Sequence, residues 1–246
     1  MANLKRCYHF LARPGRVVAL AALLVGGACI DASASPILGT FAMGGNVTFT
    51  STTITWTSST NTADEFFLSS PSGSFTGALG TNSVNNLNLA TAPVGVTFPD
   101  QTFISFDQDP TLPDLDINFI ASGVYSAAGC GATPPAPGQT CTPTGSLLSF
   151  TNNAVGSTVT WTFRGVTSDG LSTWIGLFTS TFNVPYQTVL NEMMTQGQFS
   201  NSYSAFVNVT PETAPVPEPA SMLLLGGGIG AAMLRLRRRQ SAQSSR

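Results

Sequence analysis

Apolar and polar side chains alternate with a period of two residues along much of this 246-residue chain. In residues 157–166, STVTWTFRGV, the apolar residues Val159, Trp161 and Phe163 are separated by threonines. Successive side chains of a strand point to opposite faces, so this pattern predicts antiparallel strands with one buried and one polar face. A helical domain is disfavoured, because the chain is rich in Thr, Ser, Gly and Asn and poor in the long charged side chains that helices usually expose.

The same alternation recurs elsewhere in the chain. It places Val47, Phe49, Ile54 and Trp56 on one side of residues 46–59, and Leu115, Ile117 and Phe119 on one side of residues 114–120. Residues 172–184 and 202–210 resemble further strands, and TSDGLSTW, residues 167–174, predicts a hairpin. Residues 186–197, YQTVLNEMMTQG, predict one short helix that stops at a glycine. We therefore expect an all-β domain, an antiparallel β-sandwich with one short helix.

The N-terminus has the three parts of a secretory signal peptide. It begins with four basic residues, continues with an apolar stretch and ends in small residues: Lys5, Arg6, Arg13 and Arg16, then 17–30, then Ala32-Ser33-Ala34. Small residues in this position mark the site that signal peptidase cuts. We expect signal peptidase to remove residues 1–34, so that the exported chain begins at Ser35.

Export leaves a strongly acidic chain. Between Ser35 and Leu234 the one basic residue is Arg164, against eleven Asp and Glu residues, a net charge of −10. Such a surface repels phosphate backbones, so we expect no binding to nucleic acid. The one His and the one Lys, His9 and Lys5, lie in the predicted signal peptide. The exported chain therefore cannot assemble a Ser-His-Asp, Cys-His or Ser-Lys catalytic set.

Two cysteines remain after the signal peptide, Cys130 and Cys141, in the segment GCGATPPAPGQTC. An exported chain with an even number of cysteines normally oxidises them. Proline and glycine allow this short loop to bend back on itself. We expect a structural disulfide between Cys130 and Cys141, because two thiols without a histidine are too few ligands for zinc.

The densest group of carboxylates lies in FDQDPTLPDLD, residues 106–116, and consists of Asp107, Asp109, Asp114 and Asp116. Calcium binds carboxylate and carbonyl oxygens, so these aspartates are a candidate calcium site and calcium is the one candidate cofactor. Their spacing does not match an EF-hand loop, which requires a Gly at its sixth position and a Glu at its twelfth. The alternative interpretation is a solvated turn that leads into a strand with Asp114 and Asp116 on its outer face.

Tryptophans and paired carboxylates suggest two further kinds of site. Trp56 and Trp161 share their faces with other apolar residues and are expected in the core, whereas Trp174 is a candidate exposed platform for a sugar ring. Paired carboxylates are the catalytic arrangement that remains available, as in glycoside hydrolysis. Nothing in the sequence places two of them across a cleft, so we expect no enzymatic activity.

The C-terminal segment combines a Pro-Glu-Pro motif, an apolar stretch and a basic cluster. These parts are Val216-Pro217-Glu218-Pro219, residues 220–234, and Arg235, Arg237, Arg238 and Arg239. The apolar stretch extends about 22 Å as a helix, less than the roughly 30 Å of a bilayer core. Four glycines weaken this helix, and the arginines favour a cytoplasmic end. The segment suits transient retention in the membrane better than permanent anchoring.

This order of parts resembles the PEP-CTERM sorting signal over residues 215–239. The resemblance implies a protein of a Gram-negative bacterium that is exported, held transiently in the inner membrane by a C-terminal transmembrane helix, and processed by an exosortase. It implies nothing about the fold or activity of the body. The chain then divides into a signal peptide (1–34), a secreted β-rich domain (35–214), the sorting signal (215–239) and a cytoplasmic tail (240–246).

Together these features predict an exported, non-enzymatic protein of the cell surface or exopolysaccharide matrix, with a structural or adhesive role. A carbohydrate-binding module is the first alternative, and a carboxylate-dependent glycoside hydrolase is the second. The expected partners are signal peptidase, exosortase and, for the secreted domain, extracellular polysaccharide.

Overall fold

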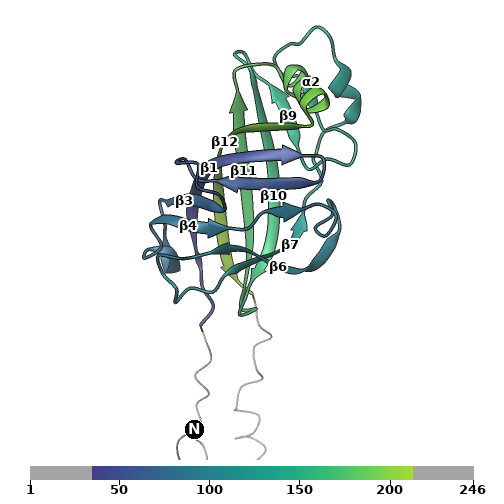
Figure 1. The fold of residues 1–246 in the computed structure, drawn as a ribbon. Coiled ribbons are helices and arrows are strands. Elements are labelled where there is room, and N and C mark those ends of the chain that lie inside the picture. Colours follow the sequence, from purple (N-terminus) through teal and green to yellow (C-terminus); the bar gives the residue numbers. More distant parts are fainter. Residues whose placement is uncertain (1–34, 213–246) are drawn as a thin grey trace, which may run out of the picture. The chain divides into compact units, whose positions relative to one another are not determined.

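The computed structural model describes residues 35–212, the body of the chain (Figure 1). The predicted signal peptide (1–34), sorting signal with its transmembrane helix (215–239) and cytoplasmic tail (240–246) lie outside these residues. Within the described part, no helix is both long and apolar enough to cross a membrane.

Strands dominate the described part of the chain. They are β1 (Gly39–Thr50), β2 (Thr53–Thr57), β3 (Glu65–Ser69), β4 (Gly80–Val84), β5 (Leu87–Asn88), β6 (Thr97–Ser105), β7 (Leu115–Ile120), β8 (Thr140–Cys141), β9 (Ser149–Asn152), β10 (Ser157–Thr167), β11 (Ser172–Phe182) and β12 (Gln198–Pro211). The helical elements are the 3₁₀ turns η1 (Gly73–Phe75) and η2 (Ala127–Gly131) and the α-helix α2 (Tyr186–Gln196).

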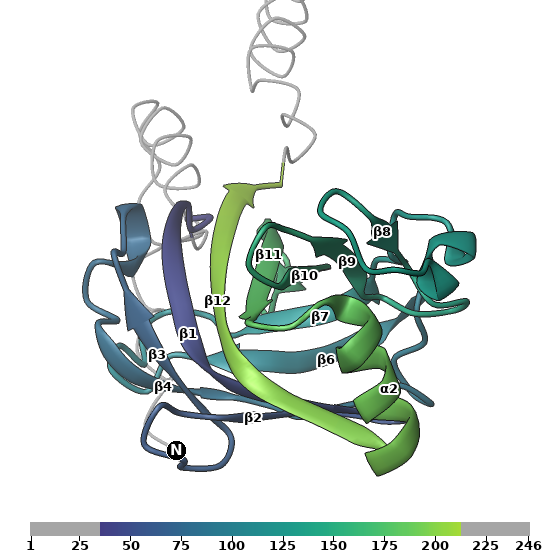
Figure 2. The same cartoon turned by 90° about the horizontal axis from the view of Figure 1, so that it is seen from above.

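Eight antiparallel strands close into a barrel. Their order around the ring is β10-β11-β12-β1-β3-β4-β6-β7, and β7 pairs with β10 to complete it. The longest ladders join β1 to β12 and β10 to β11. Figure 2 shows β12 as a long curved strand between β1 and β11. Closure removes the free sheet edges that an open sheet would expose.

The closed barrel confirms the all-β, antiparallel class with one short helix but corrects the expected β-sandwich. A sandwich and a barrel both bury one face of every strand, so both produce the same alternation of side chains. They differ in whether the end strands of the sheet pair with each other. Here β10 pairs with both β11 and β7, which turns one sheet into a ring.

Aromatic rings fill the barrel interior. Phe178 of β11 packs with its ring centroid 4.9 Å from that of Phe163 and 5.6 Å from those of Trp56 and Trp161. Trp56 and Trp161 are 1% and 2% exposed, which confirms their expected place in the core. Close-packed interiors resist deformation, so the strands are held rigidly and the outer face is the surface that partners can reach.

A bulge interrupts the pairing of β7 with β10. Arg164 pairs with Phe119, whereas the next residue of β10 pairs with Ile117. Asn118 is the extra residue, and beyond it the inward-facing side chain is Ile120. The expectation that Phe119 lies on the buried side is therefore wrong, because a bulge changes which side chains face inward. Phe119 faces outward, with the Arg164 guanidinium 5.9 Å from its ring centroid.

The expected helix is confirmed as α2, which packs against β9 and β12 at one end of the barrel (Figure 1). Gly197 ends it in the left-handed conformation, with φ of 74°, which favours glycine. Tyr186, at its first turn, is fully buried and donates its hydroxyl to the Gly129 carbonyl at 2.7 Å. Its N–H donates to Asn152 Oδ1 at 2.9 Å. These bonds join the helix to β9 and to the loop before β8.

We predict that Phe178→Ala destabilises the fold by about 3–5 kcal/mol, because it leaves a cavity among rings that cannot collapse into it. The matched control is Phe206→Ala on the neighbouring strand, where the side chain is 55% exposed. We expect this change to cost less than about 1 kcal/mol. Urea denaturation of the exported protein measures both free energies of unfolding. An equal loss of unfolding free energy in the two variants would contradict the placement of Phe178 in the core and Phe206 on the outer face.

Candidate functional site

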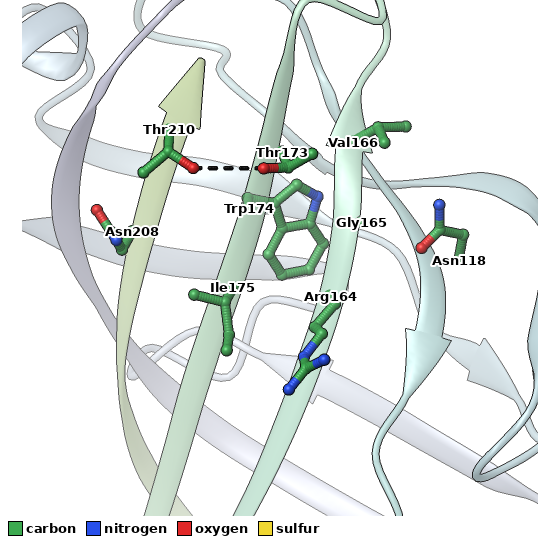
Figure 3. Close-up of a pocket in the computed structure, with 9 residues that line it drawn as sticks. All are labelled: Asn118, Arg164, Gly165, Val166, Thr173, Trp174, Ile175, Asn208 and Thr210. Carbon is green, nitrogen blue, oxygen red and sulfur yellow. Dashed lines mark hydrogen bonds between the residues drawn. The ribbon is translucent and has the colours of Figure 1, made fainter. Parts of the chain in front are cut away.

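A pocket of about 340 Å³ opens on the outer face of the barrel, over the bulge in β7 (Figure 3). Its lining comes from β7, β10, β11 and β12 and consists of Asn118, Arg164, Gly165, Val166, Thr173, Trp174, Ile175, Asn208 and Thr210. Figure 3 shows Thr173 and Thr210 joined by a hydrogen bond, which is 3.3 Å long. The pocket thus combines a guanidinium, amides and hydroxyls with apolar side chains, the mixture typical of small-ligand sites.

Arg164 supplies the one positive charge among residues 35–212, where ten residues are acidic. Its side chain is exposed, and within this part of the chain it forms no ion pair with a carboxylate. Its position follows from the ladder, in which Arg164 lies opposite Ile175 and Ile175 lies opposite Asn208. The guanidinium can therefore donate hydrogen bonds to a ligand that is seated on Ile175.

Trp174 is not the exposed platform that the sequence suggested. It is 3% exposed, and its indole N–H donates to the Asp116 backbone carbonyl at 2.8 Å. Its ring stacks on Phe103 inside the barrel, at 5.9 Å between centroids and 8° between planes. Only a small edge of the Trp174 side chain is therefore exposed at the base of the pocket, and the rest of its ring is packed in the core.

Asp116 has an unusual environment beside the pocket. Its Oδ1 is buried and has no hydrogen-bond partner among the described residues. Burial raises the pKa of the Asp116 carboxyl, and the negative charges of Asp100 and Asp114 raise it further. A hydrogen bond with the Thr102 side chain lowers the pKa and offsets part of this effect. The folded protein therefore binds a proton at Asp116 more tightly than the unfolded chain does.

The candidate calcium ligands are not gathered at one point in the structure. In the described part of the chain there is no group of three or more Asp, Glu, His or Cys side chains close enough to hold a metal ion. This holds for the four predicted ligands, Asp107, Asp109, Asp114 and Asp116. Asp107 accepts a hydrogen bond from the Ser83 hydroxyl at 2.5 Å, and Asp109 accepts one from the Thr111 hydroxyl at 2.6 Å. These contacts fit the solvated-turn interpretation. Calcium binding stays a prediction, which melting in excess EDTA tests.

A row of exposed apolar side chains on the outer face was not predicted from the sequence. This outer stripe consists of Ile175 and Leu177 on β11, Phe206 on β12 and Phe67 on β3, which are 40%, 52%, 55% and 51% exposed. Leu177 lies opposite Phe206 in the β11–β12 ladder. Ala42 and Gly44 of β1 lie between Phe206 and Phe67, since Ala42 pairs with Phe206 and Gly44 with Phe67. The stripe thus crosses four neighbouring strands.

A signal for the outer stripe was present in the sequence. In residues 202–210 the buried positions are the odd-numbered ones, such as Tyr203 and Val207, so Phe206 is a large apolar residue on the polar side. Phe66 and Phe67 are adjacent in a strand, so only one of them can lie on its buried face. Apolar residues on the wrong side of an alternation are the pattern that predicts such a surface.

The expected disulfide between Cys130 and Cys141 is confirmed, with the two Cα atoms 4.8 Å apart. It joins η2 to β8 within the proline-rich loop. Gln187 of α2 donates its Nε2–H to the Ala132 carbonyl at 3.1 Å, so the helix holds the same loop from the other side. The role of this disulfide is structural, because Cys141 is buried under the loop.

The chain ends in the signal of an exported protein that is sorted at the membrane. This tail is the PEP-CTERM protein-sorting motif, which matches residues 215–239 and confirms the expected resemblance. The motif implies export and exosortase processing in a Gram-negative bacterium. Its parts, Val216-Pro217-Glu218-Pro219 and Arg235, Arg237, Arg238 and Arg239, lie outside the described residues, so their separate roles stay predictions. No curated protein and no solved structure matches the chain.

We predict that Asp116→Asn raises the melting temperature at pH 7 by about 1–2 °C. The pKa of Asp116 is raised above its ordinary 3.8 in the folded state, so the wild type loses stability as the pH rises from about that value. The variant removes this loss and keeps the shape of the side chain. Below pH 3.8 the carboxyl is protonated in both states, so the gain disappears there. A gain that persists at pH 3, or a destabilisation at pH 7, would contradict the environment described.

Proposed function

We propose that the secreted domain, residues 35–214, is a non-enzymatic protein of the cell surface or exopolysaccharide matrix, with a structural or adhesive role. Signal peptidase removes residues 1–34, and the C-terminal helix then tethers the chain to the inner membrane. Exosortase cleaves at or near Pro217-Glu218-Pro219, because proline disfavours a helix and so favours a segment that a protease can bind. The arginine cluster stays behind, and the domain is released to its extracellular location.

The filled barrel carries this proposal. Its interior is occupied by the chain's own side chains, including Phe178 and the Trp56 and Trp161 rings, so partners meet the protein on its outer face. A closed barrel with a disulfide-held loop suits an oxidising extracellular environment, where disulfides persist. Such a body with a sorting tail is suited to display at a surface.

Binding of carbohydrate is the second candidate function. The pocket at Arg164 favours it, because its amides, hydroxyls and guanidinium can hydrogen-bond to sugar hydroxyls beside the apolar Ile175. Glycoside hydrolysis is the weaker alternative. Asp116 has a raised pKa and two carboxylate neighbours, as general acids often do, but its side chain is not part of the pocket lining.

We predict that the processed protein is recovered in the extracellular polysaccharide fraction and lacks its tail. Mass mapping of its C-terminus should find no peptide that contains Leu223 or any later residue, because exosortase cleaves before the helix. Replacing Pro217 and Pro219 by alanine lets the helix extend into the cleavage site and should leave full-length protein in the membrane. Deletion of the exosortase gene is the matched control and should have the same effect.

Three results would contradict the proposal. Extracellular protein that still carries Arg237 to Arg239 would show that the tail is not removed. Processed protein that remains in the periplasm would exclude a surface or matrix role. Release of sugars from a polysaccharide panel by the purified protein, lost on Asp116→Asn, would establish the hydrolase instead.

A further inference from the structure

One face of this acidic domain is free of carboxylates. The four strands β10, β11, β12 and β1 are neighbours in the barrel and contain no Asp or Glu. The ten acidic residues of the described chain lie on other elements or beyond the strand ends. Arg164, at one border of this face, is its one charged side chain. The face is therefore nearly neutral although the domain as a whole is strongly negative.

The outer stripe runs obliquely across this face, from Ile175 through Leu177 and Phe206 to Phe67 on the neighbouring strand β3, and polar side chains flank it. On one side Thr160 lies opposite Thr179, and Thr179 lies opposite Ser204. On the other side Arg164 and Asn208 lie on either side of Ile175. Neighbouring strands are about 4.8 Å apart, so hydroxyl, amide and guanidinium groups border the apolar surface closely on both sides.

The size of the stripe argues against a second copy of the chain as its occupant. Four side chains that are about half exposed present on the order of a few hundred Å² of apolar surface, similar to the largest patch of an ordinary monomer. A stable dimer buries about 800 Å² on each partner. The polar rows at its borders also lie where such an interface would need further apolar contacts.

We propose that the outer stripe and its polar borders bind an uncharged polysaccharide. The proposal deepens the adhesive role given above and rests on it. A sugar ring has an apolar C–H face and hydroxyls around its edge. The C–H faces pack on Leu177 of β11, Phe206 of β12 and Phe67 of β3, and β1 lies between the last two of these strands. The hydroxyls hydrogen-bond to Thr179 and Asn208, and to the guanidinium of Arg164 at the end of the stripe.

Charge selects the class of polysaccharide. Acidic residues outnumber basic ones ten to one in residues 35–212, so the field of the domain repels a chain of uronic acids. The strands β10, β11, β12 and β1 have no carboxylate to pair with an amino sugar, and Glu65 of β3, two residues from Phe67, is the one acidic residue on a strand that carries the stripe. A neutral sugar chain avoids both penalties, and its binding depends little on salt because no charges are neutralised.

The test is affinity electrophoresis of the processed, exported protein in gels that contain exopolysaccharide of the producing bacterium. Anion exchange first separates that polysaccharide into neutral and acidic fractions. We expect retardation by the neutral fraction, equal at low and high salt. Phe206→Thr and Phe67→Thr should each weaken the apparent affinity by about tenfold or more, because each removes an aromatic surface for a ring. Arg164→Gln should weaken it less.

Two matched controls replace apolar residues that are exposed away from the outer stripe. Met194→Thr on α2 and Val155→Thr before β10 change side chains that are 77% and 81% exposed. Both should keep the wild-type retardation. Melting temperatures of all variants separate loss of binding from loss of fold, since substitutions of exposed side chains change stability little.

Each other outcome overturns the proposal. No retardation by either fraction, or retardation by the acidic fraction alone, excludes an uncharged polysaccharide. Equal binding by Phe206→Thr and wild type excludes the outer stripe. A concentration-dependent dimer that Phe206→Thr abolishes makes the stripe a contact between copies. If the variants bind normally while wild type stays in the matrix, the adhesive role stands without this site. If wild type is absent from the matrix, the adhesive role fails too.

Discussion

Pairing of β10 with both β11 and β7 is the constraint on which the rest of this structure depends. It closes eight strands into a ring and gives every strand one inner and one outer face. The inner faces meet around Phe178 and its neighbouring rings, and these rings leave the interior to the protein itself. Every feature that can meet a partner therefore lies on the outside, in a position set by strand register.

Register places the outer features close together. The bulge at Asn118 points Phe119 outward and brings it under Arg164, beside the pocket. The same ladders place Leu177 opposite Phe206 and bring together β10, β11, β12 and β1, the four neighbouring strands that contain no Asp or Glu. A rigid ladder keeps such side chains in fixed relative positions, which a surface that recognises a repeating ligand requires.

Individual residues show how far the sequence predicted the site. Trp56 and Trp161 lie in the core as their alternation indicated, but Trp174 is also buried, with its ring stacked on Phe103 and its indole N–H bonded to a backbone carbonyl of β7. Phe206 carried a usable signal, an apolar residue on the polar side of its strand. The carboxylates near Asp116 were close in sequence, yet the turn and strand that hold them do not bring them to one point.

The sequence by itself determined the elements that depend on local or linear information. Alternation predicted the strands and their buried sides, and Gly197 predicted the end of α2. The even number of cysteines after a predicted signal peptide indicated the Cys130–Cys141 disulfide, and the C-terminal motif indicated sorting. Tertiary structure alone decided the closure of the sheet, the outward turn of Phe119, and the placement of Phe67 and Phe206 on the two strands that flank β1. The physical reason is that alternation within a strand shows which of its sides is buried. Which strands become neighbours depends instead on hydrogen bonds between segments that are distant in the sequence.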